Sequence, residues 1–248
     1  MDSILYEHPL NERIRQYLKI EQLFDQINHC VDKDIHDFQH VFFHAFFGIL
    51  DALERSDIRG VLLKDLEKLQ QTLVLWSKSP DVNNEMLEFN LRETVKLLAH
   101  LKMVKPIWQD LKDDKLLSAI KQRFAIQGGN SSFDLPQLRF WLYQGEEQTT
   151  HDIKLWLSKL IDVEASIALI LKFIRLRASF TTIETENGFY QDNTENILLL
   201  RLKIAKDVKY YPTISGNKYR YSIRFMHPCK QKGTRHASQA ITFELASC

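Results

Sequence analysis

Apolar residues recur at intervals of three and four from Asn11 to about Ala178, which is the spacing of one face of an α-helix. The repeat is interrupted at sites that end helices: Ser79-Pro80, Pro106, Gly128-Gly129 and Gly145. The pattern predicts helices over residues 14–27, 38–53, 60–76, 83–101, 110–124, 135–143, 150–160 and 164–177. Asp134 is expected to cap the helix that begins near Pro136, because proline is tolerated in a first helical turn.

The apolar period changes from 3.6 to 2 after Arg177, and branched and aromatic residues become frequent. Four strands are predicted, FTTIETE (180–186), ILLLRLKI (197–204), KYRYSIRFM (218–226) and AITFELA (240–246), with GFYQDNTEN, YPTISGN and HPCKQKGTRH as connecting segments. SILYEH, residues 3–8, is a fifth candidate. Helices followed by strands indicate an α+β fold. We expect a mainly α-helical domain over residues 1–178, with strand 3–8 able to join the sheet, and a small, mainly antiparallel β domain over residues 179–248.

Basic residues alternate with apolar ones in two of these strands. In one strand the inward set is Tyr219, Tyr221, Ile223 and Phe225, and the outward set is Arg220, Ser222 and Arg224. In the other, Leu198, Leu200, Leu202 and Ile204 alternate with Leu199, Arg201 and Lys203. Residues 201–235 hold ten lysines and arginines and one acid. If the two strands are neighbours, they share a basic outer face. Like charges across a sheet repel one another and cost stability, so this face is a candidate docking surface for an acidic partner. A merely solvated face is the alternative.

The whole-chain charge adds no evidence for nucleic acid or membrane binding, because 33 lysines and arginines face 32 acids. Three scattered cysteines, Cys30, Cys229 and Cys248, form no C-x-x-C pair and favour a reducing cytoplasm. The N-terminal residues lack the pattern of a secretory signal, and no segment reaches the about 18 apolar residues of a membrane span. A soluble protein is therefore expected.

Two alternative functions come from candidate chemistry. His36, His40 and His44 lie four residues apart on one helical face and could serve a metal-dependent hydrolase. The chain lacks H-E-x-x-H, phosphate-binding loops and a nucleophile elbow, so packing is the competing role, and no metal or cofactor is expected. An RNA-binding module using the basic sheet face is the second alternative. Stacking would need aromatic residues on the same face as the arginines, whereas period 2 separates them.

Four separated motifs carry a resemblance to a known family. YEHPLNERIRQYLKIE (6–21), GGNSSFDLP (128–136), GFYQDN (188–193) and PTISGNKYRYSIRFM (212–226) together resemble the ZapD family of bacterial cell division proteins. The resemblance implies a helical domain with a β domain, a homodimer, and a cytoplasmic, non-enzymatic factor at the mid-cell division site. Its implied partner is FtsZ, whose filaments it cross-links by binding the C-terminal tail peptide, with no nucleic acid or membrane partner.

The resemblance also implies which basic residues bind the tail. These positions are Lys19, Arg55, Lys115, Arg139, Arg220 and Arg224. Several family members carry arginine at the positions of Lys19 and Lys115 and histidine at that of Arg139. Charge is therefore kept, but the two lysines lack the bidentate fork of an arginine. We expect Lys19, Lys115 and Arg139 to form the tail pocket. Arg220 and Arg224 are expected to steer FtsZ or to contact the filament body.

Overall fold

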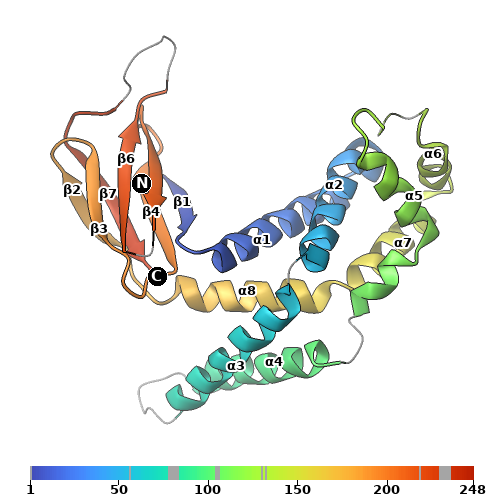
Figure 1. The fold of residues 1–248 in the computed structure, drawn as a ribbon, viewed down its shortest axis with the longest axis horizontal. Coiled ribbons are helices and arrows are strands. Elements are labelled where there is room, and N and C mark those ends of the chain that lie inside the picture. Colours follow the sequence, from blue (N-terminus) through green and yellow to red (C-terminus); the bar gives the residue numbers. More distant parts are fainter. Residues whose placement is uncertain are drawn as a thin grey trace. The chain divides into compact units, whose positions relative to one another are not determined.

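The computed structural model describes residues 2–55, 57–77, 84–103, 107–129, 131, 133–217, 219–228 and 236–248 (Figure 1). Two compact units are present: the β unit, made of residues 1–18 with 171–248, and the helical unit, made of residues 19–170. The expected breaks at Ser79-Pro80 and Pro106, and Cys229, lie outside the described residues. The division into domains at residue 178 stays a prediction.

The helices confirm the 3.6-residue pattern. They are α1 (Glu12–Val31), α2 (Ile35–Arg55), α3 (Ile58–Trp76), α4 (Asn84–Leu101), the 3-10 helix η1 (Ile107–Lys112), α5 (Lys115–Phe124), α6 (Pro136–Leu142), α7 (Glu146–Ser158) and α8 (Ile161–Arg175). The single helix predicted over residues 110–124 is divided into η1 and α5. Asp114 causes this division, because its Oδ1 accepts a hydrogen bond from Leu117 N at 2.9 Å and thereby starts α5 as an N-cap.

The start of α6 differs from its prediction. Pro136 is the first helical residue, as expected, but the N-cap is Leu135 and makes no side-chain capping bond. Asp134 is therefore not the cap. Its backbone N–H donates to Ser131 O at 2.9 Å, which places it in the turn that precedes the helix.

An aromatic cluster centred on α2 forms the core of the helical unit. Phe43 is fully buried, and its ring packs against those of Phe42, Phe47, Phe124, Trp141 and Trp156 at centroid separations of 5.1 to 6.2 Å. Because Phe124, Trp141 and Trp156 come from α5, α6 and α7, the cluster holds these three helices on α2.

Two antiparallel sheets form the β unit. Sheet A has the order β1 (Ser3–Pro9), β4 (Leu199–Ala205), β7 (Ile241–Ser247), β2 (Thr181–Thr185). Sheet B has the order β3 (Phe189–Asn193), β6 (Arg220–Met226), β5 (Tyr211–Gly216). The two sheets share one core, to which Leu202, Ile223 and Phe243 belong. The N-terminal segment pairs with β4 from Ser3↔Ala205 to Pro9↔Leu199.

Two segments that the sequence assigned to connections are strands. Phe189–Asn193 is β3 and Tyr211–Gly216 is β5. Both lie at the edges of sheet B, on either side of β6. Pro212 weakened the strand signal of β5, but an edge strand tolerates a residue that lacks a backbone donor.

The expectation of one shared basic face is wrong, because its two strands belong to different sheets. β4 pairs with β1 and β7, whereas β6 pairs with β3 and β5. The alternation within β6 is confirmed: Tyr221, Ile223 and Phe225 are buried, while Arg220 and Arg224 are exposed. Tyr219 is exposed and precedes the strand.

The basic residues of β4 have structural partners within the β unit. Glu7 accepts hydrogen bonds from Arg175 at 2.9 and 2.7 Å and from Arg201 at 2.9 Å. Lys203 lies over the ring of Phe180, with Nζ 3.8 Å from the centroid. Arg201 and Lys203 thus serve the packing of this unit.

Removing the Glu7 carboxylate is expected to destabilise the β unit. The substitution Glu7→Ala removes the carboxylate that accepts hydrogen bonds from two largely buried guanidinium groups, so the free energy of unfolding should fall by about 2–3 kcal/mol. Hydrogen exchange of the β4 amides measures this. The control is Glu184→Ala, which removes an exposed acid from β2 of the same sheet and should change stability by less than about 0.5 kcal/mol. Equal exchange in the two variants would contradict the prediction.

Candidate functional site

Helix α6 presents two of its faces to two different hollows of the helical unit. Leu135, Leu138, Arg139, Leu142 and Tyr143 follow helical spacing and line the first hollow. Pro136, Gln137, Phe140, Trp141 and Gln144 line the second. One short helix therefore divides two surfaces of different chemistry.

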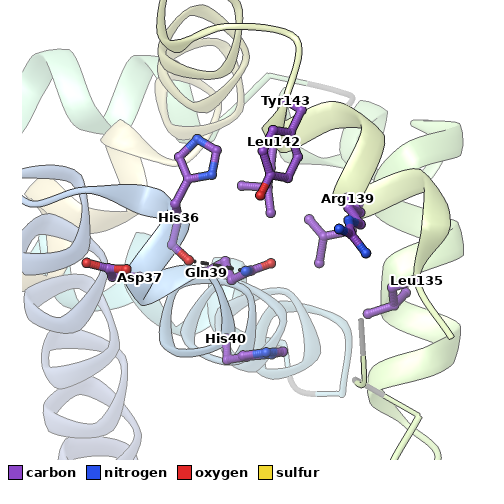
Figure 2. Close-up of a pocket in the computed structure, with 9 residues that line it drawn as sticks. His36, Asp37, Gln39, His40, Leu135, Arg139, Leu142 and Tyr143 are labelled. Atoms are coloured by element: carbon purple, nitrogen blue, oxygen red, sulfur yellow. Dashed lines mark hydrogen bonds between the residues drawn. The ribbon is translucent and has the colours of Figure 1, made fainter. Parts of the chain in front are cut away.

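The first, which we call the polar hollow, lies between α2 and α6 and has a volume of about 410 Å³. His36, Gln39 and His40 of α2 lie across it from the α6 residues (Figure 2), and Asp37 also belongs to its lining. Gln39 Nε2 donates to His36 O at 3.2 Å, and the His36 ring lies edge-on to Tyr143 at 5.6 Å. Arg139 stands at this hollow with an exposed guanidinium. Its guanidinium N–H groups can donate hydrogen bonds to a carboxylate.

The second, which we call the apolar hollow, lies between α5 and α6 and has a volume of about 510 Å³. Lys115 and Leu116 of α5 line it together with the second face of α6. Phe140 is 68% exposed there. A hollow with apolar walls and one cation suits a peptide that combines an apolar side chain with a carboxylate.

Two tryptophan–aspartate hydrogen bonds hold the helices around the apolar hollow. Trp141 Nε1 donates to Asp152 Oδ2 at 2.8 Å, and Trp156 Nε1 donates to Asp114 Oδ2 at 3.1 Å. The two indole rings pack on one another with centroids 5.4 Å apart. Asp114 also caps α5, so the same carboxylate fixes both the start of that helix and the position of Lys115.

Two of the six basic residues that the family resemblance implied line two different hollows beside α6. Lys115 is the first residue of α5 at the apolar hollow, and Arg139 is on α6 at the polar hollow. Neither has an ion-pair partner within the described ranges. Lys19 is exposed on α1 and lines neither hollow. Arg55 is the last residue of α2, and its side chain lies outside the described part of the structure.

The other two residues, Arg220 and Arg224, stand on the open face of sheet B in the β unit. Arg220 lines a shallow polar hollow of about 350 Å³ together with side chains of β3 and β5. The Arg224 guanidinium lies 5.0 Å from the centroid of Phe189. Below this face, burial raises the pKa of the Tyr221 hydroxyl, so the phenol stays neutral at physiological pH.

The three histidines proposed for a metal site have aromatic neighbours at two positions. His36 contacts Tyr143, and the His40 ring lies 5.9 Å from that of Phe124. His44 is exposed on the same helix. Across the residues that the structure describes, no three histidine, cysteine or acidic side chains are placed to hold a metal ion.

Sequence reasoning missed the residues that build the apolar hollow. Phe140, Trp141 and Leu116 carry no charge, and the expected tail pocket was assembled from charges alone. A usable signal was present in LPQLRFWL. Phe140 falls outside the helix face defined by Leu138 and Leu142, so it is an apolar residue that the packed face of the helix does not bury.

Comparisons with known proteins agree on one family. The sequence profile of the ZapD family, described as "Cell division protein", matches residues 18–224. "Cell division protein ZapD" of Idiomarina loihiensis is 39% identical over 251 residues, covering 100% of this chain and 97% of the relative. The proteins of that name from Yersinia enterocolitica and Pectobacterium carotovorum are 41% and 40% identical over 247 residues, each covering 99% of this chain and 98% of the relative.

The described helices include none with the length and apolar character needed to cross a bilayer.

The motifs noted in the sequence fall inside the matched region or within the aligned length of the relatives. A profile match over most of the chain and relatives near 40% identity along their full length lead to one assignment. This chain belongs to the ZapD family of cell division proteins.

Proposed function

We propose that this protein is a non-enzymatic cell division factor that binds the C-terminal tail of FtsZ in the cytoplasm at mid-cell. As a homodimer it cross-links FtsZ filaments into bundles and so supports assembly of the division ring. Membership of a cell division family supports the process. The surface around α6 supports binding of an acidic peptide.

The observation that carries the proposal is the pair of exposed cations beside α6, each set at a hollow. Lys115 and Arg139 have no ion-pair partner within the described residues, whereas Lys112 and Lys121 of the same unit pair with Glu54. A peptide that carries carboxylates and apolar side chains complements this surface. Each exposed charge contact is modest and weakens in salt, so several contacts must act together.

Arg220 and Arg224 have a second role in this proposal. They belong to the β unit. Asp192, the acid of β3, is paired in register with the buried Tyr221, so its side chain leaves the strand on the face opposite to the two arginines. The open face of sheet B therefore presents two arginines without an acid on its three strands. The positive charge of this face raises the rate of encounter with an acidic filament more than it raises the affinity for an isolated peptide.

Dimerisation supplies the strength that single contacts lack. A two-fold symmetric dimer has two identical tail sites, which can engage tails on separate filaments. Once one tail is bound, the second binding event takes place at a raised effective concentration. Exposed apolar side chains on α3 and α4, among them Leu75, Met86 and Phe89, supply a surface of the kind that a second copy covers.

Sedimentation with FtsZ tests the proposal. In the presence of GTP, the protein should pellet with full-length FtsZ filaments at low speed, and analytical ultracentrifugation should show a dimer. FtsZ that lacks its C-terminal tail should still form filaments but should neither bundle nor carry this protein into the pellet. Bundling that persists without the tail would overturn the tail-binding proposal, and a monomer that bundles would overturn the role of the dimer.

A further inference from the structure

The apolar hollow has the lining of a side-chain pocket. Trp141 is buried and its indole N–H already donates to Asp152, so the part of its ring that lines the hollow offers only apolar surface. Leu116 and Pro136 add aliphatic surface, and the exposed ring of Phe140 forms one wall. A volume of about 510 Å³ lies in the range of ligand pockets. The walls therefore suit a large apolar side chain delivered by a partner.

The rim of the same hollow carries one cation. Among the described residues of the lining, Lys115 alone carries a charge. Lys115 is the first residue of α5, where the aligned peptide dipoles add partial positive charge. The neighbouring Asp114 bonds to Leu117 N and to Trp156 Nε1, and both of these groups belong to the packed interior. A carboxylate of the partner thus meets Lys115 at the edge of an apolar pocket.

We propose that the apolar hollow is an anchor subsite that takes one large apolar side chain of an acidic peptide, while Lys115 pairs with a carboxylate beside that side chain. This inference rests on the proposed function and deepens it. Phe140 becomes a specificity-determining residue, because its ring contacts the anchor. Peptides held by grooves of this kind owe much of their affinity to such anchors.

Two variants change the subsite without changing its charge. Phe140→Ala removes a wall of the hollow, and Gln144→Trp places a large ring in it. Calorimetric titration with the isolated FtsZ tail peptide should show binding weakened between about 5-fold and about 30-fold in each variant. The heat-capacity change of binding should also become less negative, because less apolar surface is buried.

A peptide in which the large apolar residues are replaced by alanine completes the experiment. It should bind the wild-type protein more weakly by a similar factor, and Phe140→Ala should weaken it no further, since the two changes remove the same contact. The control is Phe133→Ala, which removes another exposed phenylalanine that lines neither hollow and should alter affinity less than about twofold. Circular dichroism verifies that each variant is folded.

The outcomes separate the subsite from the proposed function. Absence of tail binding by the wild-type protein would overturn both. If the wild-type protein binds, and Arg139→Glu weakens binding while Phe140→Ala and Gln144→Trp do not, the anchor subsite is wrong and tail binding stands. If Phe133→Ala is as harmful as Phe140→Ala, binding is spread over exposed aromatic rings and the subsite is also wrong.

Discussion

Reversing the charge of Arg139 is expected to weaken binding of the isolated FtsZ tail peptide between about tenfold and about 100-fold, which is about 1.4 to 2.8 kcal/mol. The guanidinium is exposed at the polar hollow and is available to a carboxylate of the peptide. Arg139→Glu removes this attraction and also sets a negative charge against the peptide. The effect should therefore exceed the loss of one exposed contact. Fluorescence anisotropy of a labelled peptide at constant ionic strength measures it.

The same reversal at Arg224 is expected to act on bundling. Arg224→Glu should reduce low-speed pelleting of FtsZ filaments, while peptide affinity stays within a few-fold, the scale of about 1 kcal/mol. The control is Lys154→Glu, an equal reversal on the exposed surface of α7 outside both hollows, which should change neither measurement. If peptide affinity collapses in Arg224→Glu and survives in Arg139→Glu, with both proteins folded and dimeric, sheet B holds the tail pocket.

Truncation of Phe43 is expected to have the largest effect on stability. Phe43→Ala opens a cavity among rings of α2, α5, α6 and α7, so the free energy of unfolding of the helical unit should fall by about 3–5 kcal/mol. Tryptophan fluorescence during urea unfolding is a selective measurement, because Trp76, Trp108, Trp141 and Trp156 all belong to residues 19–170. Tail binding should fall with it, since the same rings position α5 and α6.

A matched control is available on the same helix. Val41 is 46% exposed, and Val41→Ala should change the free energy of unfolding by less than about 0.5 kcal/mol. A loss of less than about 1 kcal/mol in Phe43→Ala would show that the cluster repacks around the missing ring and would contradict the role given to it.

Local patterns in the sequence were enough to predict most elements of the fold. Helix α2 was predictable because its phenylalanines recur on one face, and β6 because its buried and exposed residues alternate. The edge strands β3 and β5 were missed, since their short segments are rich in turn-forming residues and rely on β6 for their hydrogen bonds. The cap of α6 was misassigned, because Ser131 accepts the bond that fixes the preceding turn.

The candidate site was only partly accessible from the sequence. Lys115 and Arg139 came from the family resemblance, which names positions without giving their surroundings. The apolar hollow remained unseen, because Leu116 and Phe140 lie 24 positions apart in the chain and meet only through the packing of α5 against α6.

The sequence by itself determined the α+β class, the order of helices before strands, and the family, because these depend on local periodicity and on motifs that can be read in order. Only the tertiary structure decided which strands are neighbours. It separated β4 from β6, so Arg201 pairs with Glu7 while Arg224 stays on an open face. The physical reason is that strand pairing and hollow formation depend on contacts between remote segments, which the period of a single segment does not specify.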